Sequence, residues 1–210
     1  MAPKKEKTIE EVYQKKSQLE HVLHRPGMYI GDIDRVAAER WIFENGSFIK
    51  KTINYSPGLY KIFDEIFTNA TDHSQRDETM KRIEVTFSET GEIVVMNDGQ
   101  GIPIEIHKEL GKYVPEIIFG EFHTSSNYDD TEARTVGGLN GYGSKLTNAF
   151  SKTFTVEICD GKNHFIQTWQ NNMNTKTEPK IKAKKAKSFT KICLFSQFLV
   201  LWKNNDRRRL

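Results

Sequence analysis

The most informative stretch of this 210-residue chain is Asp64-Glu65-Ile66-Phe67-Thr68-Asn69-Ala70-Thr71-Asp72. It lies within residues 59–74, where apolar residues recur at the spacing of one helical face. On such a helix Glu65, Asn69 and Asp72 share a face beside the apolar stripe. A carboxylate there can accept a proton from an attacking water, and an amide oxygen is a suitable ligand for Mg²⁺. An ordinary solvent-facing stripe would show the same pattern.

A second motif, Asn97-Asp98-Gly99-Gln100-Gly101-Ile102-Pro103, directly follows a strand expected at residues 92–96. A turn at residues 89–91 joins this strand to another at 82–87. The two glycines allow a ligand to approach the backbone closely, and the Asp98 carboxylate can accept a hydrogen bond from an exocyclic amine such as that of adenine. The alternative is a plain Asp-Gly turn.

The third motif, Gly137-Gly138-Leu139-Asn140-Gly141-Tyr142-Gly143-Ser144-Lys145, leads into a short helix expected at residues 144–151. Glycines before a helix N-terminus leave backbone N–H groups free for phosphate oxygens, and Lys145 adds a positive charge. The spacing fits neither a P-loop nor a dinucleotide-binding fingerprint. A flexible linker remains the alternative for a lone glycine-rich loop.

The rest of the chain mixes helices and strands, and that order predicts an α+β fold with one sheet covered by helices on one face. The further expected elements are a polar arm or loose helix at 1–20, a helix at 115–122, a long polar loop at 124–143, a hairpin of 153–159 with 164–169, and a strand at 189–195.

Composition excludes several classes of protein. The 13 Phe, 7 Tyr and 3 Trp are too many for a disordered chain, although only 37% of residues are hydrophobic. No apolar run approaches the ~20 residues of a membrane helix, and the N-terminus lacks the apolar region of a secretory signal. Two cysteines make neither a disulfide framework nor a metal knuckle. A soluble intracellular protein is therefore expected.

The net charge of +3 hides an asymmetry. Residues 174–210 hold 11 Lys or Arg against 2 Asp or Glu, so the preceding residues carry a net charge of −6. The basic segment could touch DNA, or act as a nuclear address through Lys182-Ala183-Lys184-Lys185-Ala186-Lys187. It could equally be a solvated flexible segment.

Taken together, the motifs resemble the N-terminal ATP-binding domain of type IIA DNA topoisomerases, in the eukaryotic and large-DNA-virus branch of the GHKL superfamily. The resemblance covers about residues 12–195. Besides the three motifs, it is carried by Tyr13-Gln14-Lys15-Lys16-Ser17-Gln18-Leu19-Glu20-His21, Arg25-Pro26, Tyr29-Ile30-Gly31, Lys61-Ile62-Phe63, Tyr113-Val114-Pro115, Ile118-Phe119-Gly120, Thr124-Ser125-Ser126-Asn127-Tyr128-Asp129-Asp130 and Gln167-Thr168-Trp169.

The resemblance implies a fold and a division of the chain. The fold would be the GHKL (Bergerat) ATPase sandwich, a mixed sheet covered by helices on one face. Residues 1–24 would form an arm or strap, 25–195 the ATP-binding domain, and 196–210 a divergent basic tail. The implied cofactors are ATP and Mg²⁺.

The resemblance also implies roles for single residues. Glu65 would be the general base, Asn69 would hold Mg²⁺, and Asp98 would receive the adenine amino group, where eukaryotic-type topoisomerases often carry Asn. Ser125, Ser126 and Asn127 would contact the ribose and phosphates. The triphosphate would be wrapped by Gly138, Leu139, Asn140, Gly141, Tyr142, Gly143, Ser144 and Lys145.

The implied function is ATP-driven closure of a dimer gate for DNA strand passage and topology change. The strap around Tyr13 would reach a second copy in a homodimer, DNA would be a partner of the full-length relative, and no membrane would be involved. The location would be the nucleus for a cellular protein, or the host cell for a viral one.

Two departures from the family pattern bear on activity. Leu139 stands where the family's loop usually has Arg, which removes a cation beside the phosphates. After Ile192 the chain looks unlike the family, which continues into a transducer domain whose Lys reaches the γ-phosphate. A truncated or frame-shifted reading frame would explain this, and slow or absent hydrolysis would follow. The alternative function is a non-catalytic nucleotide-binding or dimerisation fragment from a truncated gene.

Overall fold

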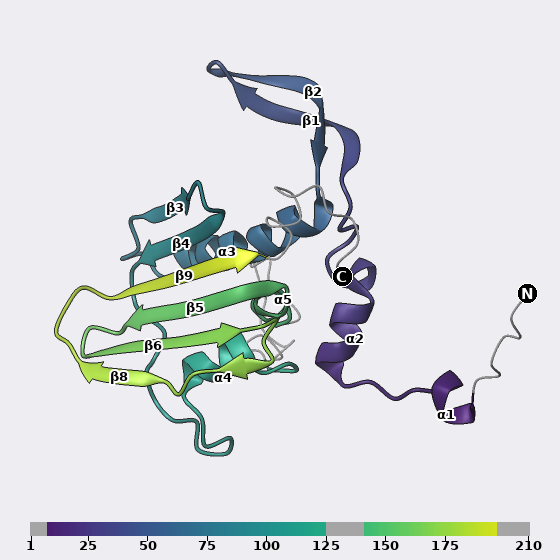
Figure 1. Ribbon diagram of the computed structural model, residues 1–210. Helices are drawn as coiled ribbons and strands as arrows, with labels where there is room; N and C mark the ends of the chain where they lie inside the picture. Colours follow the sequence, from purple (N-terminus) through teal and green to yellow (C-terminus); the bar gives the residue numbers. More distant parts are fainter. Residues whose placement is uncertain (1–7, 125–140, 197–210) are drawn as a thin grey trace, which may run out of the picture.

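The computed structural model describes residues 8–124 and 141–196. Figure 1 shows a sheet with helices packed behind it and a separate hairpin that extends away from it. The elements are α1 (Ile9–Val12), α2 (Gln18–His24), η1 (Pro26–Met28), β1 (Val36–Glu44), β2 (Ser47–Tyr55), α3 (Pro57–Arg76), β3 (Ile83–Phe87), β4 (Glu92–Asp98), α4 (Val114–Gly120), α5 (Gly143–Ala149), β5 (Ser151–Cys159), β6 (Asn163–Gln170), β7 (Thr175–Lys176), β8 (Lys180–Ala183) and β9 (Phe189–Ser196).

The large sheet has the order β3-β4-β9-β5-β6-β7, and β8 also pairs with β6. The α+β class and the helices on one face are confirmed (Figure 1). The expected mixed sheet is wrong for the described strands, because all of their pairings are antiparallel. β9 lies in the centre of the sheet, where Leu194 is 1% exposed. The residues just after Ile192 therefore complete a central strand.

The helix predicted at residues 59–74 is confirmed as α3, which is two residues longer at each end. Ser56 caps it, because its hydroxyl accepts the backbone N–H of Leu59 at 3.3 Å, and Pro57 occupies its first turn. The face formed by Ile62, Ile66 and Ala70 is buried. This orientation turns the Glu65 face toward the neighbouring elements.

For residues 1–20 the sequence predicted a polar arm or a loose helix, and the structure has a well-capped helix, α2, that begins at Gln18. Ser17 and Glu20 make a complete capping box, with each side chain accepting the other residue's backbone N–H. Val22 is 0% exposed in a cluster with Leu146 and Ala149 of α5. The helix therefore packs on the body of the fold, while the boundaries at residues 24/25 and 195/196 stay predictions.

The hairpin β1–β2 was not predicted from the sequence. Its turn is Asn45-Gly46, and both residues have the positive φ (52° and 82°) that a tight two-residue hairpin turn requires. Trp41, Phe43 and Phe48 on one of its faces are largely exposed.

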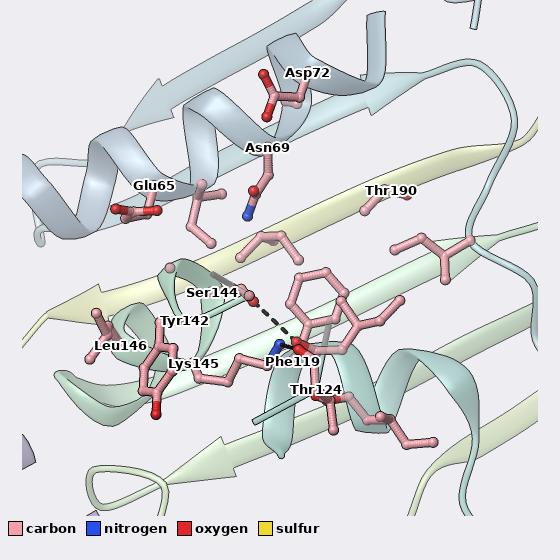
Figure 2. Close-up of a pocket in the computed structure, with 18 of the residues that line it drawn as sticks. Glu65, Asn69, Asp72, Phe119, Thr124, Tyr142, Ser144, Lys145, Leu146 and Thr190 are labelled. Carbon is pink, nitrogen blue, oxygen red and sulfur yellow. Dashed lines mark hydrogen bonds between the residues drawn. The ribbon is translucent and has the colours of Figure 1, made fainter. Parts of the chain in front are cut away.

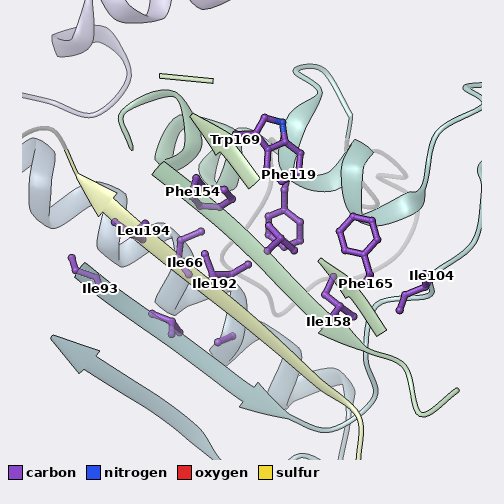
Figure 3. Packing of buried hydrophobic residues seen from close by; sticks show 13 residues of the cluster. Ile66, Ile93, Ile104, Phe119, Phe154, Ile158, Phe165, Trp169, Ile192 and Leu194 are labelled. Carbon is purple, nitrogen blue, oxygen red and sulfur yellow. The ribbon is translucent and has the colours of Figure 1, made fainter. Parts of the chain in front are cut away.

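Two buried clusters meet along α3. The larger one fills the space between the sheet and helices α3 and α4, and Figure 3 shows Ile66 and Phe119 facing Phe154, Ile192 and Leu194 of the strands. The smaller one joins α2, α3 and α5 through Val22, Ile62, Leu146, Ala149 and Phe150. Within the described residues, no helix is long and apolar enough to span a bilayer.

Candidate functional site

A cavity of about 1380 Å³ lies between α3, the sheet and helices α4 and α5. Glu65, Asn69 and Asp72 all line it, and Figure 2 shows them in succession along α3. The prediction that these three side chains share one face of a helix is confirmed. The stripe is turned into a cavity, so it is not an ordinary solvent-facing surface.

Glu65 is held in place from two sides. The Lys61 ammonium lies one turn earlier on α3, with Nζ 2.5 Å from Glu65 Oε1, and this hydrogen bond raises the pKa of Lys61. On the other side is Gly143, at the start of α5. A Cβ at Gly143 would overlap the Glu65 carboxylate, so only glycine fits there without a shift of Glu65. The carboxylate is thus fixed where α3 meets α5.

The oxygen donor of Asn69 fits a magnesium ion that keeps most of its waters better than it fits a metal ion coordinated entirely by protein side chains. The described residues contain no group of three or more His, Cys, Asp or Glu that could hold a metal ion. Mg²⁺ is usually bound by one or two protein oxygens together with waters and substrate phosphates. The amide oxygen of Asn69, one turn from Glu65 and in the same cavity, is an oxygen ligand of that kind.

The predicted glycine-rich motif reaches the same cavity. Gly141, Tyr142, Gly143, Ser144 and Lys145 all line it. Ser125, Ser126, Asn127, Gly138, Leu139 and Asn140 lie outside the described residues, and their predicted roles stay predictions.

Lys145 is a buried cation in the first turn of α5. It is 2% exposed, and burial lowers the pKa of its ammonium to about 8. Nζ donates a hydrogen bond of 2.7 Å to the backbone oxygen of Thr124, drawn as a dashed line in Figure 2. One charged group is therefore kept inside the cavity wall at neutral pH.

Asp98 does not line the cavity. Its Oδ1 accepts the backbone N–H groups of Lys81 and Arg82 at 2.8 Å each, and these bonds, that of Lys81 foremost, hold the pKa of the carboxyl below its ordinary value. Asn97 lines the cavity instead and is 7% exposed. Successive strand residues point to opposite faces of the sheet. Ile93, Val95 and Asn97 alternate as the buried residues of β4, and this pattern places Asn97, and not Asp98, on the cavity side.

Thr190 was not among the site residues predicted from the sequence. It pairs with Asn97 across β9 and β4, and both residues line the cavity. Figure 2 shows the position of Thr190. The same alternation, applied to the strand predicted at residues 189–195, places Thr190 and Ile192 on one face. The cavity therefore has a polar pair, Asn97 and Thr190, on its floor.

Comparisons with known proteins agree with this geometry. The family model described as "Histidine kinase-, DNA gyrase B-, and HSP90-like ATPase" matches residues 54–185. The chain belongs to this ATPase family. The match spans α3, β4 and α5, which provide most of the cavity residues described above.

Within this ATPase family, the chain is similar to the type II topoisomerases. It is 54% identical to DNA topoisomerase 2 of Candida glabrata over 192 residues, which are 89% of this chain and 14% of that protein. For DNA topoisomerase 2 of Pisum sativum the identity is 50% over 190 residues, 89% of this chain and 13% of that protein. The resemblance predicted from the motifs is confirmed.

A solved structure also shows similarity to the type II topoisomerases. The ATPase and transducer domains of DNA topoisomerase II from Balamuthia mandrillaris superpose with a TM-score of 0.89 at 45% identity, over 92% of this chain and 52% of that one. The chain thus spans about an eighth of the curated relatives and half of this solved structure.

Proposed function

We propose that this chain is the ATP-binding and ATP-hydrolysing domain of a type IIA DNA topoisomerase, and that Mg²⁺ accompanies the nucleotide. The observation that carries the proposal is the shared cavity. A carboxylate, an amide one turn later on α3, a second amide on β4 and the start of α5 converge there. A binding function without turnover would not need Glu65 to be fixed by both Lys61 and Gly143.

The distribution of side chains gives ATP an orientation in the cavity. Asn97 and Thr190 offer both donors and acceptors beside the apolar side chains of Val95, Ile102 and Ile192, an environment suited to the adenine ring. Figure 2 shows Thr190 at the opposite side of the cavity from Glu65. The triphosphate would accordingly extend toward Glu65 and Lys145.

In this orientation each group has a chemical task. Glu65 orients a water for attack on the γ-phosphate and accepts its proton, while Lys61 keeps the carboxylate in position. Lys145 places positive charge near the phosphates. The side-chain oxygen of Asn69 would hold Mg²⁺, which would supply positive charge to neutralise the phosphates. Phosphoryl transfer depends mainly on such positioning and charge stabilisation.

The wider setting of this function is part of the proposal. We infer that the strap around Tyr13 docks on a second copy when ATP binds, and its exposed side chain (80%) supports an intermolecular role. In the full-length protein this closure would drive DNA strand passage. A nuclear location in a cellular source would follow from that role.

The experiment that tests the proposal measures binding and turnover separately. Titration calorimetry with ATP and Mg²⁺ should show binding to the wild-type chain and to Glu65→Gln alike. In contrast to the slow or absent hydrolysis expected from the departures in sequence, a phosphate-release assay should show measurable turnover by the wild type. That turnover should fall at least ~100-fold in Glu65→Gln, since loss of a general base costs about that much or more. No heat of binding by the wild type would overturn the nucleotide function. Equal turnover by both proteins would overturn the role of Glu65.

A further inference from the structure

A row of five lysines occupies one edge of the large sheet. β8 is an edge strand that pairs only with β6, and Figure 1 shows it at the opposite border from β3. All five are exposed, and they lie on β8 or in the turn that follows it. This lysine edge consists of Lys180, Lys182, Lys184, Lys185 and Lys187.

The backbone of the lysine edge has a fixed position in the fold. Lys180 and Lys182 lie opposite Ile166 and His164 in the β6–β8 ladder. Beyond the strand, the N–H of Lys184 donates to the oxygen of Lys162 at 2.8 Å, and the Cys159 thiol faces the Lys184 oxygen at 3.9 Å. These backbone contacts exclude, for residues 180–184, the alternative that the basic segment is solvated and flexible.

No acidic side chain neutralises the lysine edge within residues 8–124 and 141–196. The structure shows no ion pair there for any of the five, whereas Lys176 and Lys191 beside them pair with Glu116 and Glu157. Five like charges in eight residues repel one another and so weaken folding. Internal contacts therefore do not explain the cluster.

We propose that the lysine edge binds the phosphate backbone of duplex DNA without sequence preference. Choosing DNA among polyanions rests on the proposed function. Side chains two residues apart on a strand are separated by about 6.8 Å, which is the axial rise of about two phosphates on one DNA strand. Lys180 and Lys182 thus present ammonium groups at a spacing that matches every second phosphate of one strand. Residues 1–173 carry a net negative charge, so as a whole they do not attract DNA.

A matched pair of variants tests the proposal. The first replaces the five lysines of the edge by glutamine, at Lys180, Lys182, Lys184, Lys185 and Lys187. The control makes five Lys→Gln changes at exposed lysines elsewhere, at Lys50, Lys51, Lys81, Lys108 and Lys152. The two variants have equal net charge, so a difference between them reports position. Circular dichroism and gel filtration of both establish that they are folded and monodisperse.

Fluorescence anisotropy with a labelled DNA duplex of mixed sequence gives the readout, at salt concentrations between about 50 and 200 mM. Each phosphate contact contributes about −0.9 to the slope of log K against log salt. Replacing the edge lysines should reduce the steepness of that slope by up to about 4.5 and weaken binding at least tenfold. The control should keep most of the wild-type slope.

Three outcomes would overturn the proposal. Equal weakening in both variants would mean that only net charge matters. Unchanged DNA binding in the edge variant would mean that the lysines serve only to keep an edge strand from pairing with other chains. Equally tight binding to anionic phosphatidylserine vesicles or polyglutamate, with the same loss in the edge variant, would show a general polyanion surface. Calorimetry with ATP on the same variants tests the nucleotide function independently, so a failure of DNA binding can be told apart from a failure of ATP binding.

Discussion

At the scale of single residues, Lys145 couples nucleotide binding to pH. Burial lowers the pKa of its ammonium to about 8, so the charge is present at pH 7 and is lost as the pH rises through 8. Between about pH 8 and 10.5 the folded chain binds fewer protons than the unfolded chain, and the stability of the fold rises with pH in that window. A triphosphate beside Lys145 favours the charged form.

We therefore expect the affinity for ATP to fall roughly tenfold between about pH 7 and pH 9. Calorimetry near pH 8 in two buffers of different ionisation heat should show proton uptake on binding, because ATP raises the pKa of the ammonium. Lys145→Met should abolish both effects. Proton release, or affinity that does not change with pH in the wild type, would contradict a phosphate contact by Lys145.

Asn97 and Asp98 are neighbours whose substitution should have opposite consequences. Asn97→Ala should weaken ATP binding about tenfold or more, since a buried polar contact in the cavity is lost, with little effect on stability. Asp98→Ala should leave the affinity nearly unchanged and lower the free energy of unfolding by about 1 kcal/mol, because two backbone N–H groups lose their acceptor. Calorimetry and urea denaturation of both variants make the comparison.

The Asp98 effect should also depend on pH. The pKa of this carboxyl is lowered in the folded chain, so its stabilising contribution is complete above the ordinary value of 3.8 and disappears as the pH falls. Wild type and Asp98→Ala should therefore converge in stability at acidic pH. Weaker ATP binding by Asp98→Ala in the folded protein would restore the role first expected from the sequence.

At the scale of elements, the cap of α2 offers a test of local sequence. Ser17→Ala removes the acceptor for the Glu20 N–H and should cost about 1 kcal/mol of stability, measured by urea denaturation. Glu20→Gln is the matched control, because glutamine can still accept the Ser17 N–H. If both changes cost the same, the charge of Glu20 rather than the box geometry stabilises the helix start.

The elements that the sequence predicted depend on local patterns, whereas some features of the fold depend on contacts between residues far apart in the chain. α3 and the β5–β6 hairpin carry periodic apolar residues, and periodicity is local information. The Asn45-Gly46 turn and the Ser17–Glu20 box are local signals too. Leu19, Val22 and Leu23 follow the box at helical spacing, so the sequence did contain the signal for α2, although the segment is short. The place of β9 between β4 and β5 is a long-range pairing, which no local pattern contains.

The site shows the same distinction. Glu65 and Asn69 could be assigned from helical spacing, because both lie on one element. Alternation along β4 and β9 separates Asn97 from Asp98 and groups Thr190 with Ile192. Only the β4–β9 pairing, which joins residues 93 positions apart, shows that Asn97 and Thr190 meet in one cavity. A motif indicates that a ligand is near, whereas the sheet decides which of two adjacent side chains can reach it.

At the scale of the whole molecule, the cavity joins the two buried clusters. Its walls include Ile66 and Ile192 of the larger cluster and Leu146 of the smaller one. α3 belongs to both clusters through Ile62 and Ile66. A ligand in the cavity therefore stabilises contacts on both sides of α3, and the fold should unfold as one cooperative unit.

ATP with Mg²⁺ at about 100 times its dissociation constant should add about 2.7 kcal/mol of stability. For a chain of this size that corresponds to a rise in Tm of roughly 5–11 °C. Differential scanning calorimetry should show one transition that moves as a whole, and Asn97→Ala at the same ATP concentration should move much less. Two transitions, of which only one responds to ATP, would mean that the nucleotide contacts only one cluster, and the shared cavity would then have no thermodynamic role.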